Sequence, residues 1–166
     1  MNQSQIHLAL THMPVVLSLT GLVILIISLI RKNQTGMNIS FYILLAAGLF
    51  TIPVFLSGEG AEEMVERIPG VSEAVIEKHE DVAKISLWII LATALVAIAG
   101  LIRKAGKQLQ FVRYFVLIFA IASAGLMVFT AHLGGQIRHT EISSSVAQNS
   151  QDGGEGNVNN EEDEDD

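Results

Sequence analysis

Four long stretches of the chain contain no Asp, Glu, Lys or Arg, and this exclusion of charge limits the fold more than any other feature. Each stretch has 18 or 19 residues, the length that a helix needs to cross about 30 Å of hydrocarbon. A soluble globular enzyme is therefore excluded, and we expect an integral membrane protein that contacts the lipid bilayer. The stretches are residues 13–30, 39–57, 85–102 and 115–133.

The connections between these stretches predict how the helices pack. Short segments join the first stretch to the second and the third to the fourth, so two helical hairpins are expected. The predicted fold is all-α, a four-helix transmembrane bundle of up-down-up-down order over residues 1–140. Residues 141–166 are rich in Ser, Gln, Asn, Gly and acids and lack the apolar surface that folding requires. We expect this acidic C-terminal tail to be disordered.

Charges outside the four stretches separate by sign. All 17 acidic residues lie in the loop 58–84 or in the tail, whereas six of the ten basic residues lie in the loops 31–38 and 103–114, which hold no acid. Because loops rich in Lys and Arg stay in the cytoplasm, the sequence predicts that both termini lie outside. The expected location is the bacterial cytoplasmic (inner) membrane, with the termini in the periplasm.

The loop 58–84 also carries helical signals. The segment 61–68, AEEMVERI, predicts one or two amphipathic turns, and Pro69-Gly70 then breaks the chain. Ser72 is a candidate N-cap for a helix that continues without interruption into the third apolar stretch. We therefore expect this third helix to begin in water and to enter the lipid.

Composition excludes several functions. The absence of cysteine excludes cysteine-ligated iron–sulfur clusters, thiolate nucleophiles and covalent CxxCH haem attachment. The net charge of −7 argues against nucleic acid as a partner, since binding phosphate requires clustered Lys and Arg. The apolar stretches also lack the buried acids and bases that proton pumps and ion-coupled transporters use. Histidine, carboxylate and methionine remain as ligands.

All five histidines fall on the predicted outer side although they come from separate parts of the sequence. Imidazoles from different helices of a bundle commonly hold haem iron or a transition metal. The alternative is that these side chains only cap helix ends or contact lipid headgroups. The residues are His7, His12, His79, His132 and His139.

Neighbouring residues leave two further questions open. Carboxylates beside the histidines, Glu62, Glu63 and Glu80, could complete a mixed metal site or could form a solvated acidic face. A stripe of mostly small residues below His79, and Gly125 seven residues before His132, allow either close helix packing or space for a flat cofactor. The stripe consists of Ala83, Ser86, Ile90, Thr93 and Ala97.

Two segments, IHLALTHMPVVL and AHLGGQIRHTEI, resemble a bacterial family of small four-span membrane proteins that is a domain of unknown function. Its members begin with an HPxxVHFPIAL-like motif and end with an HLGGxxVYxHG-like motif. The resemblance covers about residues 6–142, with departures at Leu8 and Arg138. The matching positions are His7 and His12 in the first motif, His132, Gly134, Gly135 and His139 in the second, and His79 as an isolated middle histidine.

This resemblance implies a redox or haem-linked setting, because related domains occur joined to Rieske or cytochrome c modules. The leading hypothesis is a b-type haem at the periplasmic face that passes electrons to a periplasmic redox protein. His12 and His132 are the preferred axial ligands, since both lie at the membrane boundary on different helices. His79 could replace either or bind a second group, and His7 and His139 are candidates for supporting roles or a second site.

Two alternatives remain beside haem. One is a periplasm-facing module for Zn, Cu or Fe, held by His12, His79 and His132 with Glu62, Glu63 or Glu80. The other is a non-catalytic membrane scaffold subunit. The sequence predicts neither an oligomeric state nor a reaction.

Overall fold

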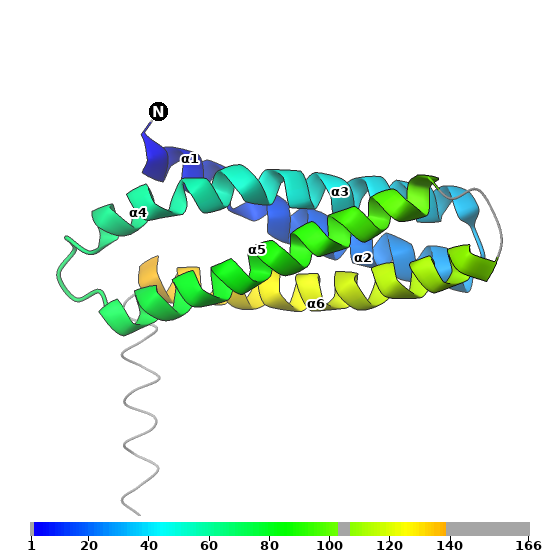
Figure 1. The fold of residues 1–166 in the computed structure, drawn as a ribbon. Coiled ribbons are helices and arrows are strands. Elements are labelled where there is room, and N and C mark those ends of the chain that lie inside the picture. Colours follow the sequence, from blue (N-terminus) through cyan, green and yellow to red (C-terminus); the bar gives the residue numbers. More distant parts are fainter. Residues whose placement is uncertain (1, 103–106, 139–166) are drawn as a thin grey trace, which may run out of the picture.

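The computed structural model describes residues 2–102 and 107–138. Those residues contain six helices and no strand, so the predicted all-α class is confirmed (Figure 1). The proposed acidic tail and His139 lie outside the described residues. The helices are α1 (Gln3–Leu10), α2 (His12–Ile30), α3 (Gln34–Leu56), α4 (Gly58–Val65), α5 (Glu73–Ile102) and α6 (Lys107–Arg138).

Four helical segments of the described chain are long and apolar enough to cross a membrane. Three of them cover a predicted stretch in full and extend beyond it into the outer region, and the second ends at Leu56, one residue before the end of its predicted stretch. The amphipathic start of α5 follows Ser72 directly, as predicted. The segments are Gln3–Ile30, Gln34–Leu56, Glu73–Ile102 and Gln110–Ile137.

The first segment begins ten residues earlier than the predicted stretch, because the polar N-terminus is itself helical. The Asn2 side chain accepts from the backbone N–H of Gln5, and the Gln5 side chain accepts from the N–H of Asn2. This reciprocal capping box satisfies two donors that a helix start otherwise leaves unpaired. Thr11, between α1 and α2, keeps helical dihedral angles of φ −52° and ψ −36°. His7 and His12 therefore lie on one nearly continuous helix.

The helices form two antiparallel hairpins that pack side by side. Helix α2 packs along α3 and α5 along α6, while α3 contacts α5 and α2 contacts α6. Figure 1 shows the resulting up-down-up-down bundle, with α1, α4, the start of α5 and the end of α6 gathered at one end. The predicted bundle order is confirmed, and it brings distant segments of sequence to that end.

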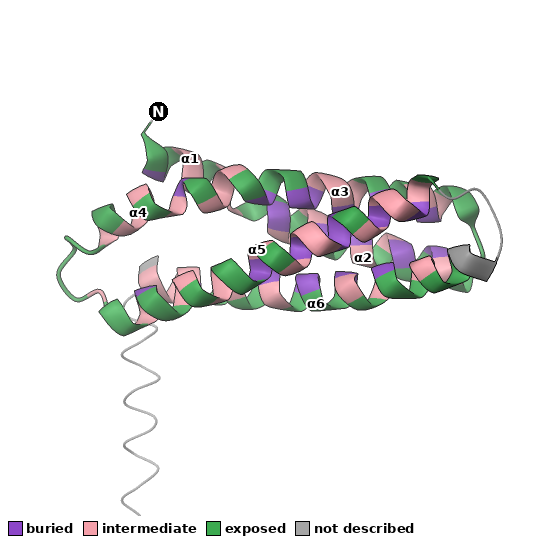
Figure 2. Ribbon diagram, in the orientation of Figure 1, coloured by how far each residue is buried: buried purple, intermediate pink, exposed green. Residues whose placement is uncertain are grey.

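Buried and exposed residues alternate along the helices of the bundle (Figure 2). Small and hydroxyl-bearing residues make up much of the buried set, beside larger side chains such as Leu25, Phe41 and Leu44, and many large aliphatic residues are exposed. A Cβ atom on Gly48 would lie 2.9 Å from the Cβ atom of Ala94, so α3 and α5 approach closely at this glycine. Such small contacts are typical of helix packing in lipid, where burial of large apolar groups brings no gain over lipid contact. Outward-facing examples with more than half of their area exposed are Val23, Leu49, Leu95 and Ile118.

Hydroxyl groups join α5 to α6 at two levels. The oxygen atoms of Ser86 and Thr130 lie 2.9 Å apart, and those of Thr93 and Ser123 lie 2.7 Å apart. Close packing is thus the role of most of the stripe below His79, since Ser86, Ile90, Thr93 and Ala97 are buried. Gly125, in contrast, is exposed and has nothing within 4 Å of its Cβ position, so its stripe faces away from the bundle.

The outer loop contains a helix, as its sequence predicts, but α4 begins at Gly58 rather than after Gly60. The reason is the contact with α1: Ser4 Oγ donates to the Gly60 carbonyl at 2.8 Å, and a Cβ atom on Gly60 would meet the Gln3 Cβ atom at 2.6 Å. After α4 the chain turns at Gly70, whose φ of 90° suits glycine.

Candidate functional site

His7 is anchored to a neighbouring helix through its Nδ1 atom. The Nδ1 atom lies 2.9 Å from the carbonyl oxygen of Val54, near the C-terminus of α3. Carbonyls at a helix end lack an intrahelical donor, and this one also accepts from Ser57 Oγ at 3.0 Å. Because a carbonyl only accepts, Nδ1 carries the proton, and a neutral ring then has an unprotonated Nε2.

His79 is anchored in the same manner on the other hairpin. Its Nδ1 atom donates to the carbonyl oxygen of Thr130 on α6 at 3.1 Å. The side chain of Thr130 is fixed in turn, since its Oγ1 atom donates to Leu126 and contacts Ser86 Oγ. The neutral His79 ring therefore also has its lone pair on Nε2.

A glycine lies against each imidazole. A Cβ atom on Gly58 would be 3.7 Å from His7 Cε1, and one on Gly134 would be 3.3 Å from His79 Cε1. The Gly134 distance is tighter than ordinary van der Waals contact, so only glycine lets His79 reach the Thr130 carbonyl undisturbed. The second glycine of the HLGG segment, Gly135, has nothing within 4 Å of its Cβ position.

The two anchored rings belong to α1 and to the start of α5, which lie at the same outer end of the bundle. Both rings are partly buried. Neither Nε2 atom has a hydrogen-bond partner within residues 2–102 and 107–138. Two imidazoles from separate hairpins, each with its orientation and tautomer fixed by a backbone carbonyl, form what we call the His7–His79 pair.

The two histidines preferred from the sequence occupy other faces. His12 follows His7 by five residues, or about 140° round a helix, and His132 follows Thr130 by two residues, or about 200°. Both side chains are exposed, and His132 Nε2 already accepts from the Gln136 amide at 3.2 Å. The structure therefore brings together His7 and His79 and leaves His12 and His132 outside that pair.

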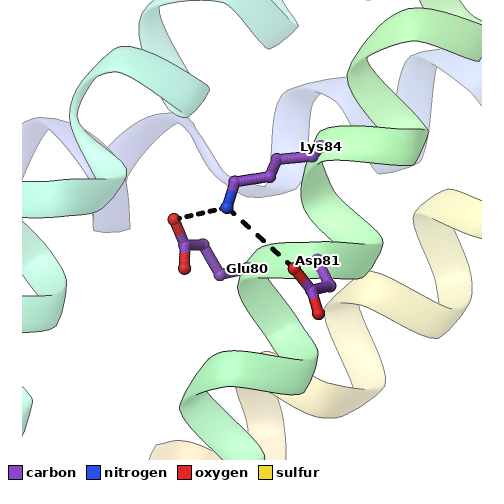
Figure 3. A network of polar contacts seen from close by, with 3 residues as sticks. All are labelled: Glu80, Asp81 and Lys84. Atoms are coloured by element: carbon purple, nitrogen blue, oxygen red, sulfur yellow. Dashed lines mark ion pairs between the residues drawn. The ribbon is translucent and has the colours of Figure 1, made fainter.

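The carboxylates near the pair are engaged in electrostatic contacts of their own. Glu80 Oε1 lies 2.9 Å from Lys84 Nζ, and Asp81 Oδ1 lies 4.0 Å from the same nitrogen (Figure 3). Glu62 lies on α4 near Glu80, whereas Glu63 is exposed. An ion pair with lysine competes with metal for the Glu80 carboxylate.

Burial from water raises the pKa of Glu62 above its ordinary value. The negative charge of Glu80 raises it further, as do those of Glu66 and Glu59, while Lys84 lowers it. Within the described part of the chain, no group of three or more His, Asp or Glu side chains is arranged to hold a metal ion. The mixed site of histidines with Glu62, Glu63 or Glu80 stays a prediction.

Comparison with known proteins places this fold in a family. A family described as predicted membrane protein (DUF2231) matches residues 3–141. The chain belongs to this family. Neither a curated protein nor a solved structure is significantly similar to it.

The DUF2231 match includes every described helix and both members of the His7–His79 pair. It confirms the family resemblance and the membrane class that the sequence predicts. The sequence predicts neither the anchoring carbonyls nor the contact of Gly58 with His7.

The sequence does indicate which helix face each histidine of the pair occupies. His7 precedes the buried residues Pro14, Gly21 and Ser28 at intervals of seven. His79 precedes the buried residues Ser86, Thr93 and Gly100 at the same intervals.

Proposed function

We propose that this DUF2231 protein holds a b-type haem between His7 and His79 and transfers electrons at the outer face of a bacterial inner membrane. The observation that carries the proposal is the His7–His79 pair, in which both Nδ1 atoms donate to backbone carbonyls of another helix. Hydrogen bonding of the second ring nitrogen fixes the tautomer and orientation of a ligating histidine. His7 and His79 thus replace His12 and His132 as the proposed axial ligands.

The number of ligands favours haem over a bare metal ion. Protein zinc sites use three or four side-chain ligands, and the described residues contain no suitable group of three. Haem iron takes four nitrogens from the porphyrin and needs only one or two from the protein. Two imidazoles on opposed hairpins are therefore a sufficient donor set.

The residues of the chain would hold and orient the cofactor. Val54 and Thr130 would keep the two Nε2 atoms unprotonated, and Gly134 would leave room for the His79 ring to hold its position. A bound haem would supply one-electron transfer, and His7 and His79 would be the residues that hold it. Electron transfer to a periplasmic redox protein is therefore the proposed role rather than catalysis.

The distribution of charge indicates which side of the membrane the pair would face. Arg31 and Lys32 lie at the bundle end opposite α4, and all acids of the described chain lie near the His7–His79 pair. The positive-inside rule assigns the basic end to the cytoplasm, so the pair would face the periplasm.

Titration of haemin into the detergent-solubilised protein, followed by Soret absorbance, tests the ligand assignment. His7→Ala and His79→Ala should each weaken haem binding at least about tenfold, a loss of about 1.4 kcal/mol. The control variants His12→Ala and His132→Ala remove exposed histidines of α2 and α6 that lie outside the pair, and they should bind as the parent protein does.

Three other results would each reject this assignment. A larger loss in the His12 or His132 variants would restore the ligands expected from the sequence. Binding of Zn, Cu or Fe that depends on the pair, without any haem binding, would favour a metal module. Equal absorbance in all variants and no saturable binding would favour a scaffold role.

A further inference from the structure

Arg113 occupies a distinctive position at the end of the bundle opposite the His7–His79 pair. It lies in the first turns of α6 and is partly buried against the start of α3. Its Nη2 atom donates to Gln34 Oε1, and the Gln34 amide nitrogen donates to Asn38 Oδ1 at 2.9 Å. The guanidinium group is thus held in place by a neutral partner.

One nitrogen of this guanidinium has no hydrogen-bond partner among the described residues. The Nε atom is buried and forms no hydrogen bond with any described residue. Nε and Nη2 lie on the same edge of the guanidinium, the edge that binds a carboxylate or phosphate through two parallel hydrogen bonds. A buried donor on a charged group is costly when it stays unpaired, so an anion at this edge would remove a real penalty.

Among the described residues, no carboxylate forms an ion pair at this end of the bundle. The ion pairs of the described residues involve only Lys84, at the opposite end. Arg31 and Lys32, in the turn that leads to Gln34, are both exposed, and neither neighbouring loop contains Asp or Glu. The described residues at this end therefore carry an excess of positive charge that would attract an anion.

The depth of the site indicates the source of that counterion. Tyr114, next to Arg113, and Tyr42, two turns after Gln34, are each 61% exposed. Tyrosine rings favour the headgroup level of a bilayer. Basic pockets between transmembrane helices at this level are suited to anionic lipid headgroups.

We propose that Arg113, with Gln34 and the basic turn at Arg31 and Lys32, binds the phosphate of an anionic phospholipid. This site is separate from the His7–His79 pair and does not depend on the proposed function. Bound lipid would complete the guanidinium edge and tie α6 to the hairpin of α2 and α3.

Native mass spectrometry and thermal unfolding test the site on the full chain in mild detergent. Phosphatidylglycerol should remain bound to the parent protein and raise its melting temperature by about 4 °C. Arg113→Gln should lose both effects. Arg67 is an exposed residue that follows α4. Arg67→Gln also removes one positive charge, so it serves as the matched control and should keep the bound lipid and the rise in melting temperature.

Two additional experiments identify the anion and keep the proposal testable if Arg113→Gln does not fold. Inorganic phosphate that reproduces the full shift without lipid would overturn the lipid assignment. Arg113→Lys keeps the charge but lacks the Nε–Nη2 edge, so we expect at least about fivefold less retained lipid even if Arg113→Gln does not fold. Retention equal to that of the parent protein in either Arg113 variant would overturn the site.

Discussion

At the residue scale, the candidate site depends on atoms that carry no charge. The Val54 and Thr130 carbonyls determine the tautomers of His7 and His79, and Gly134 determines how near His79 can approach α6. The residue types of a histidine motif therefore matter less than the face of the helix on which each histidine lies.

Gly134→Ala should disturb His79, whereas Gly135→Ala should not. Alanine favours a helix over glycine by about 1 kcal/mol, so Gly135→Ala should be neutral or slightly stabilising. In Gly134→Ala the new Cβ atom displaces His79 and weakens a hydrogen bond worth about 1 kcal/mol. We expect a lower free energy of unfolding than for Gly135→Ala, together with weaker haem binding, measured by denaturant unfolding and haemin titration. Identical behaviour of the two variants would contradict the proposed role of Gly134.

The raised pKa of Glu62 predicts a pH-dependent stability. A carboxyl group with a higher pKa in the folded state binds its proton more tightly there, so its contribution is favourable at low pH and is lost as pH rises through the folded pKa. Glu62→Gln removes this loss and should be more stable than the parent protein near pH 7.

The gain should be below about 0.5 kcal/mol because solvent screens the site, and it should disappear under acidic conditions where Glu62 is protonated in both states. Thermal unfolding across pH measures it. Glu63→Gln removes the same charge from an exposed position of α4 and should show no such gain. A gain in stability for Glu62→Gln that grows as pH falls would contradict the raised pKa of Glu62.

At the element scale, the sequence predicts the helices better than their ends or faces. The exclusion of charge shows only which residues lie in lipid, so it predicts a helix over residues 13–30. The helix extends back to Gln3 because Asn2 caps its start and Thr11 keeps helical dihedral angles. The face of each histidine was available from the seven-residue intervals that lead to Ser28 and Gly100. The sequence does not predict which helix faces oppose each other, because that depends on how the two hairpins pack.

The interhelical contact between Thr93 and Ser123 should be measurable as an energetic coupling. Both side chains are fully buried, and their oxygen atoms lie 2.7 Å apart. A double-mutant cycle of Thr93→Val and Ser123→Ala should give about 0.6 kcal/mol, with an upper limit of about 1.7 kcal/mol, by unfolding in bicelles. Thr51, which donates within its own helix to Ala47, should show no coupling to Ser123. Strictly additive effects of Thr93→Val and Ser123→Ala would contradict the contact.

At the scale of the whole molecule, the bundle has an acidic end and a basic end, and the two proposed sites lie at opposite ends. Charge placement predicts which end faces outward, and the order of helices then predicts a periplasmic location for the His7–His79 pair.

The absence of cysteine makes the orientation directly testable. A single cysteine at Ser72, before α5, should react with a membrane-impermeant maleimide in intact bacterial cells. A single cysteine at Thr35, exposed in the first turn of α3, should react only after lysis. The reverse pattern would place the His7–His79 pair in the cytoplasm and would exclude a periplasmic electron partner.

The most direct test of the proposed haem site is the reduced-minus-oxidised absorption spectrum of protein purified from haem-supplied membranes. The parent protein and the double variant His12→Ala/His132→Ala should both show Soret and α bands, and His7→Ala/His79→Ala should show neither. Absence of the bands from the parent protein, or their persistence in His7→Ala/His79→Ala, would contradict haem ligation by this pair.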